Sequence, residues 1–180
     1  MDNIKKGYKF SNVSKDFYGV IPHERAIEIA DYEFFWDSVD ELAPFGSEEG
    51  YIAFIEFNDW MIDNPNQPAI NCIIWVLNSW DLSINDYNDK IIEDENILKI
   101  IKDLDFDEDL LALDVAIIAT GFSQLIIEGK IDNDVKNIVH LAILRQMNSN
   151  VLNAFLDSNE DWKYERYKYL QILLEILEKA

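Results

Sequence analysis

Apolar residues recur three and four positions apart over most of this chain, which is the spacing that places side chains on one face of an α-helix. Between these stretches lie short runs of proline, glycine, asparagine and aspartate, which favour turns. The pattern predicts helices over residues 22–30, 48–63, 70–80, 97–102, 108–128, 132–147 and 160–179.

Start and stop signals support several of these boundaries. Ser47 precedes Glu48 and Glu49, an N-cap followed by acidic residues that the helix dipole favours. Gly129 is a typical stop for the apolar helix before it. The two prolines between residues 63 and 70 separate two helices that we expect to pack antiparallel.

Two segments lack helical spacing. Residues 1–21 mix lysine, asparagine and aromatics, which indicates an irregular or short-stranded N-terminal arm. Residues 81–96 are polar and rich in turn residues, and we expect a flexible acidic loop. The predicted fold is therefore mostly α: a single compact multi-helix domain of antiparallel helices spanning residues 1–180.

Composition supports a folded chain in a reducing compartment. The hydrophobic fraction of 49% is too high for a disordered protein. Residues 110–127 are apolar enough to raise the question of a membrane helix, but Asp114 and Gln124 interrupt them, so we expect a buried core helix. The lone Cys72 and the absence of a leader-like pattern favour a cytoplasmic protein.

The charge is strongly negative and unevenly distributed. The formal net charge is -20, and from Asp31 to Asp89 there are thirteen carboxylates with no lysine, arginine or histidine. Such a field repels nucleic acid and anionic membranes and accelerates encounter with cationic proteins. We therefore expect a basic protein partner, and neither nucleic acid nor a membrane.

Metal and cofactor motifs are weak. The alternating acids Asp103, Asp105, Asp107 and Asp109, followed by Asp114, resemble a calcium loop, but Glu108 stands where the loop requires glycine. His23, His140 and Cys72 lack zinc-ligand spacing. We expect no metal and no cofactor.

Catalytic motifs are absent too, since no phosphate-binding glycine loop or nucleophile elbow occurs. Cys72 should be a quiet packing residue, because apolar surroundings raise the pKa of a thiol. His140 should be a hydrogen-bonded structural histidine, and His23 a surface residue. We predict no catalytic residue.

Residues 34–50 combine an aromatic cluster, a Pro-Phe-Gly turn and acidic residues just before a predicted helix. Either the aromatics anchor the turn in the core while polar groups cap the helix, or the segment is a recognition surface. The run from Phe35 to Gly50 resembles the Trp-Asp, Pro-Phe-Gly and acidic-Gly pattern of bacterial YfeS-like proteins, which are related to the MolR type. The resemblance covers about a tenth of the chain and implies a bacterial cytoplasmic protein, but no reaction or ligand.

These patterns favour a protein-binding protein of the immunity or antitoxin kind, which neutralises a basic partner such as a nuclease toxin domain. One alternative is a helical scaffold or regulator with apolar contacts. Another is a hydrolase that uses carboxylates or a divalent metal. The predicted partner contacts are Trp36, Asp37, Asp40, Glu41, Glu48, Glu49, Asp59, Asp86 and Asp89.

Overall fold

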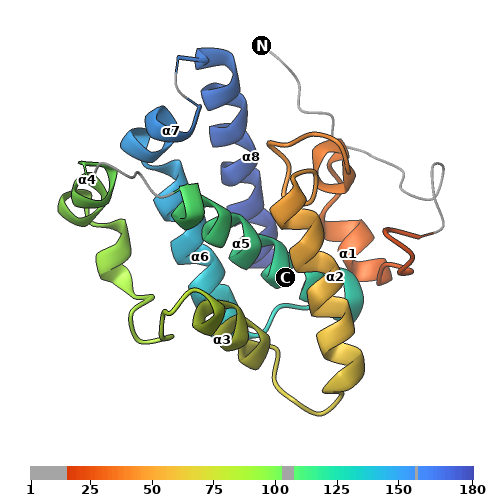
Figure 1. Cartoon of the computed structure of the whole chain (residues 1–180). Helices are drawn as coiled ribbons and strands as arrows, with labels where there is room; N and C mark the ends of the chain where they lie inside the picture. Colours follow the sequence, from red (N-terminus) through yellow and green to blue (C-terminus); the bar gives the residue numbers. More distant parts are fainter. Residues whose placement is uncertain (1–15, 103–107, 157) are drawn as a thin grey trace.

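The computed structural model describes residues 16–102, 108–156 and 158–180, and these form a compact helical assembly (Figure 1). The helices are α1 (Glu24–Ile29), α2 (Glu48–Asp63), α3 (Ile70–Ser79), α4 (Asp94–Lys102), α5 (Glu108–Glu128), α6 (Asn133–Met147), α7 (Ser149–Leu156) and α8 (Glu160–Lys179), with 3₁₀ turns η2 (Glu33–Trp36) and η3 (Asp89–Ile92). The mostly helical prediction is confirmed.

Helix α5 is the centre of the fold, and α1, α2, α3 and α6 all pack against it (Figure 1). Residues 111–128 of this helix are long enough and apolar enough to cross a membrane, yet 78% of this segment is buried inside the protein. The expectation of a buried core helix is confirmed. Gly129, at φ +72°, ends the helix as predicted, because this left-handed backbone favours glycine.

The boundaries at the predicted caps hold. Ser47 has extended backbone angles and its side chain accepts a hydrogen bond from the Gly50 amide, so it is the N-cap of α2. Asp132 has the same extended conformation and immediately precedes α6.

Three details differ from the prediction. Helices α2 and α3 do not form an antiparallel pair, because each packs mainly on α5. Helix α7 was not anticipated. The segment predicted as a flexible loop, 81–96, contains η3 and the start of α4, and Tyr87 within it is buried.

The N-terminal arm is described only from residue 16 onward. Phe17 and Val20 form an isolated antiparallel bridge around a tight turn, in which Gly19 has φ +81°. Phe17 packs edge-on against the rings of Trp36 and Phe45, so this part of the arm belongs to the core.

The aromatic residues of the 34–50 segment are core residues as well. Phe35 and Phe45 are fully buried, and Phe35 meets Phe122 of α5 edge-on. Trp36 is also buried, and its indole Nε1 donates to the Ala30 carbonyl at 2.8 Å. The prediction that Trp36 contacts a partner is therefore wrong, because its ring is already enclosed by its own chain.

Candidate functional site

The outer face of α2 carries a row of exposed carboxylates. A helix turns about 100° per residue, so positions 48, 52, 56, 59 and 63 share one face. Four of these five are acidic, Ile52 being the exception, and all are exposed. Glu49, in the first turn, lies on the edge of this face.

Between α2, α3 and α5 lies a cavity of about 370 Å³, here named the α2–α3 groove. Its lining residues are Glu49, Ile52, Ala53, Glu56, Trp75, Val76, Ser79, Trp80, Ala112 and Ala116. Trp75 is 48% exposed and Ile52 is 42% exposed, so two large apolar side chains stand open beside two carboxylates.

The carboxylates around this groove have no cation within the described chain. The described part of the chain contains the ion pairs Lys130–Asp132, Lys163–Glu160 and Arg145–Asp114. None of them involves an acid between Asp37 and Asp89. Negative charge on α2 is therefore left to solvent or to a partner.

Of the predicted contact residues, the structure brings Glu48, Glu49 and Asp59 together on α2. Glu56 and Trp75 belong to the same site and were not predicted. A signal for Trp75 existed in the sequence, because it falls on the side of α3 opposite the inward series Ile70, Ile73 and Leu77.

Other predicted contacts have structural tasks. Asp37 Oδ1 accepts from the amides of Val39 and Asp40. Asp40 is half-buried, with Oδ1 accepting from the Leu42 amide and Oδ2 from the Tyr169 hydroxyl at 2.9 Å. These two carboxylates bond the turn before α2, whereas the helix itself is capped by Ser47.

Asp86 and Asp89 are exposed but do not line the α2–α3 groove. Asp86 accepts a hydrogen bond from the Ser83 amide, and Asp89 opens the 3₁₀ turn η3. The structure thus separates them from the cluster on α2.

A second cavity, here named the central pocket, adjoins the groove and shares Glu49 and Ala112 with it. It has a volume of about 330 Å³ and is lined by Glu41, Ser47, Glu49, Leu111, Ala112, Val115, Ala154, Phe155 and Arg166. Glu41, one of the predicted contacts, lies here rather than in the groove.

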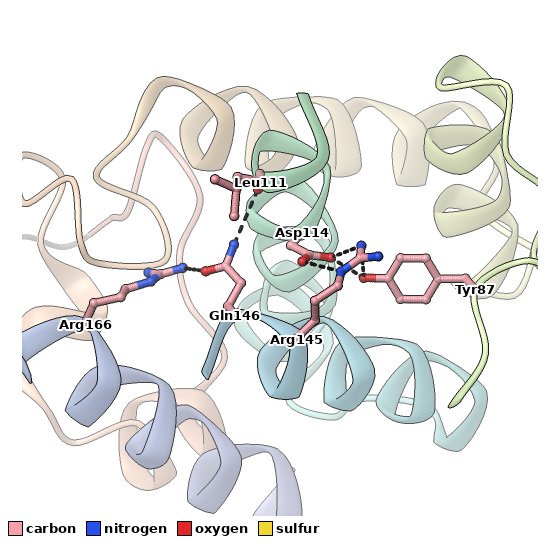
Figure 2. Close-up of polar contacts among 6 residues, drawn as sticks. All are labelled: Tyr87, Leu111, Asp114, Arg145, Gln146 and Arg166. Atoms are coloured by element: carbon pink, nitrogen blue, oxygen red, sulfur yellow. Dashed lines mark hydrogen bonds and ion pairs between the residues drawn. The ribbon is translucent and has the colours of Figure 1, made fainter. Parts of the chain in front are cut away.

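Buried polar side chains join several helices through hydrogen bonds (Figure 2). Arg145 of α6 donates Nε to Asp114 Oδ2 at 2.8 Å and Nη2 to Asp114 Oδ1 at 2.6 Å. The Tyr87 hydroxyl donates to Asp114 Oδ1 at 2.5 Å. Burial and the neighbouring Asp114 carboxylate raise the pKa of Tyr87, and Asp114 raises the pKa of Arg145 against the effect of burial.

Arg166 of α8 is the second buried guanidinium, and it has no carboxylate hydrogen-bonded to it in the described structure. Its Nη1 donates to the Leu42 carbonyl at 2.5 Å and its Nη2 to Gln146 Oε1 (Figure 2). Its Nε has no hydrogen-bond acceptor among the residues that the structure describes. Burial lowers the pKa of Arg166 to about 10.

The metal and histidine predictions have mixed outcomes. In the part of the chain that the structure describes, no three His, Cys, Asp or Glu side chains are grouped to hold a metal ion. The acids at positions 103, 105 and 107 and the Asp109 side chain lie outside the described residues. Asp114 faces Arg145, so the role of calcium ligand considered for it is wrong.

Each remaining candidate has a simple environment. His140 is exposed, so the prediction of a structural histidine is wrong. His23 is exposed as expected, and it caps α1 by accepting from the Arg25 amide. Cys72 is buried, as expected of a packing residue, and burial raises its pKa to about 12.

No protein-family model, no curated protein and no solved structure matches this chain. The resemblance of residues 35–50 to YfeS-like proteins therefore stays a prediction.

Proposed function

We propose that this protein binds and neutralises a basic protein partner through the α2–α3 groove, as bacterial immunity proteins and antitoxins of the cytoplasm do. The observation that carries the proposal is the exposure of Trp75 and Ile52 directly beside Glu49 and Glu56, two carboxylates without an ion pair in the described chain.

This combination suits protein recognition for two reasons. A few buried residues, tryptophan prominent among them, supply most of the binding energy at protein interfaces. Carboxylates around them accelerate association with a positively charged surface and suppress binding of negatively charged ones. Nuclease domains carry basic clefts, so a nuclease toxin is a suitable partner.

The experiment starts with capture of basic proteins by the immobilised chain from the host lysate, with the product of the adjacent gene as first candidate. The purified partner is then titrated by calorimetry at roughly 50 mM salt, where surface charges are weakly screened, and at roughly 500 mM salt, where they are strongly screened. We expect affinity to fall steeply with salt.

Matched variants locate the interface. Glu49→Gln/Glu56→Gln/Asp59→Asn removes three exposed charges of α2, of which Glu49 and Glu56 line the groove. Glu28→Gln/Glu175→Gln/Glu178→Gln removes three exposed charges elsewhere. We expect the first set to weaken binding at least tenfold and the second to change it little. Trp75→Ala should weaken binding at both salt concentrations. Equal effects of the two sets, or affinity indifferent to salt, would contradict the proposal.

A second candidate function is a helical scaffold that associates through apolar surface. Phe155, Trp162, Tyr164 and Tyr167 of α7 and α8 are exposed, as this alternative expects. Light scattering at low and high salt decides it, because a monomer under both conditions excludes self-association.

A further inference from the structure

The central pocket differs from the α2–α3 groove in having a cation in its wall. Arg166 is only 2% exposed, and its two hydrogen-bonded nitrogens meet a backbone carbonyl and a side-chain amide, both neutral. The third nitrogen, Nε, has no acceptor within residues 16–102, 108–156 and 158–180. Asp40 and Asp114 act on this charge through space without a hydrogen bond to it, so the side chain that lines the pocket is a buried cation with an unused donor.

Arg145 shows how this fold treats a guanidinium when it serves structure alone. Its Nε and Nη2 donate to both oxygens of Asp114, so the charge is compensated within the chain. A buried guanidinium without such a carboxylate costs several kcal/mol in desolvation, and the lowered pKa of Arg166 reflects this burial. A negatively charged acceptor oxygen from outside the chain would give Arg166 the hydrogen bond and counter-charge that Asp114 gives Arg145.

The rest of the pocket restricts what can bring that oxygen. Glu41 and Glu49 are exposed carboxylates of the same pocket, and the whole chain has a net charge of -20. A simple anion is repelled by this field. A ligand with a carboxylate and an ammonium group is neutral overall, and both of its charges find partners here.

We propose that the central pocket binds a small zwitterion of the α-amino acid class with an apolar side chain. Its carboxylate accepts from Arg166 Nε, its ammonium group donates to Glu41 or Glu49, and its side chain packs on Leu111, Val115 and Phe155. The volume of about 330 Å³ lies at the lower end of the range for small-molecule sites. This proposal does not rest on partner binding in the α2–α3 groove, although the two cavities share Glu49 and Ala112.

Three probes of matched shape test the two charges: L-leucine, 4-methylpentanoate, which lacks the ammonium group, and isopentylamine, which lacks the carboxylate. Calorimetry should give leucine at least about tenfold tighter binding than either fragment, which corresponds to about 1.4 kcal/mol for the missing contact. Isopentylamine binding as tightly as leucine, or no binding of leucine or L-phenylalanine at millimolar concentration, overturns the proposal.

Side-chain NMR reports on the arginine directly. The chain has three arginines, so a ¹⁵N spectrum contains three Nε–H signals. Leucine should shift the Arg166 signal and slow its proton exchange, while the Arg145 signal, whose Nε already donates to Asp114, serves as internal reference. Binding of leucine without a shift at Arg166 overturns the assignment.

Variants complete the test. Arg166→Gln should lose leucine binding, but it also removes hydrogen bonds to Leu42 and Gln146 and can unfold the chain. Ala154→Phe fills the pocket without altering Arg166, and Asn153→Phe places the same ring at an exposed neighbouring position outside the pocket. We expect at least a tenfold loss for Ala154→Phe and none for Asn153→Phe; equal affinities of these two variants overturn the proposal.

Discussion

Asp114 is the residue whose role is clearest from its contacts. It is fully buried, accepts two hydrogen bonds from Arg145 and one from Tyr87, and joins α5, α6 and the segment before η3. The sequence showed it as an interruption of an apolar run and as a position of a weak calcium-loop pattern, but not as an ion-pair residue, because its partners lie 31 and 27 positions away.

We expect Asp114→Asn to lower the free energy of unfolding by about 3–5 kcal/mol, since it leaves the Arg145 charge buried without a counter-charge. Urea unfolding followed by circular dichroism measures this loss. Glu160→Gln is the control, because Glu160 pairs with Lys163 at the surface with its side chain 83% exposed, and such pairs contribute under about 1 kcal/mol. Similar losses in both variants would show that Arg145 is not held by the pair.

Cys72 gives a prediction in pH. Burial raises its pKa from 9.0 to about 12, so between these values the unfolded chain releases a proton that the folded chain retains. The contribution of Cys72 to folding is intact below pH 9 and declines as pH rises toward 12. We expect negligible reaction with a thiol reagent at pH 8 without denaturant, and a smaller alkaline loss of stability in Cys72→Ala than in the parent chain. Rapid labelling of the folded chain would contradict this.

At the scale of elements, the boundaries set by local chemistry were predictable and the packing partners were not. Ser47 and Gly129 act on their own helix ends, so their signals are readable without the fold. The prediction that α2 pairs with α3 was wrong because α5 is apolar on nearly all sides, and both helices pack against it. Helix α7 was missed because its eight residues include Ser149, Asn150 and Asn153, which are weak helix formers.

The junction between α2 and the preceding turn depends on Gly50. A Cβ atom there would collide with the Pro44 carbonyl oxygen, which is backbone and cannot move alone. We expect Gly50→Ala to destabilise the protein by about 1–3 kcal/mol, as overpacking does, although alanine favours helices over glycine. Asp59→Ala, at an exposed position of the same helix, should stay within about 0.5 kcal/mol. Thermal unfolding compares the two variants. A stabilised Gly50→Ala variant would show that the Pro44 backbone can move away from the added methyl group.

At the scale of the whole molecule, the sequence predicted an acidic surface but not its arrangement. The charge count placed the acids outside the core correctly for Glu48, Glu49 and Asp59, whereas Asp40 is half-buried against Tyr169. Arg166 was not foreseen, because only the fold reveals that α8 places it beside Leu42 and Gln146. Leu42 lies 124 positions and Gln146 20 positions from Arg166 along the chain, and contacts at such separations leave no local pattern.

The net charge of -20 predicts how stability depends on salt. Carboxylates on α2 repel one another in the compact state, and ions screen this repulsion. We expect the urea midpoint to rise between roughly 10 mM and 200 mM sodium chloride, and to rise less in Glu49→Gln/Glu56→Gln/Asp59→Asn. A midpoint independent of salt would mean that the repulsion is negligible.

The same triple variant separates folding from binding. If these α2 carboxylates serve a partner rather than the fold, their removal should raise stability at low salt while it weakens partner binding, which is the usual opposition between the two at functional sites. If they serve solubility alone, the charge-matched variant Glu28→Gln/Glu175→Gln/Glu178→Gln should behave identically in both measurements. A gain in stability confined to the groove variant would locate the strongest repulsion on α2, where a basic surface relieves it most.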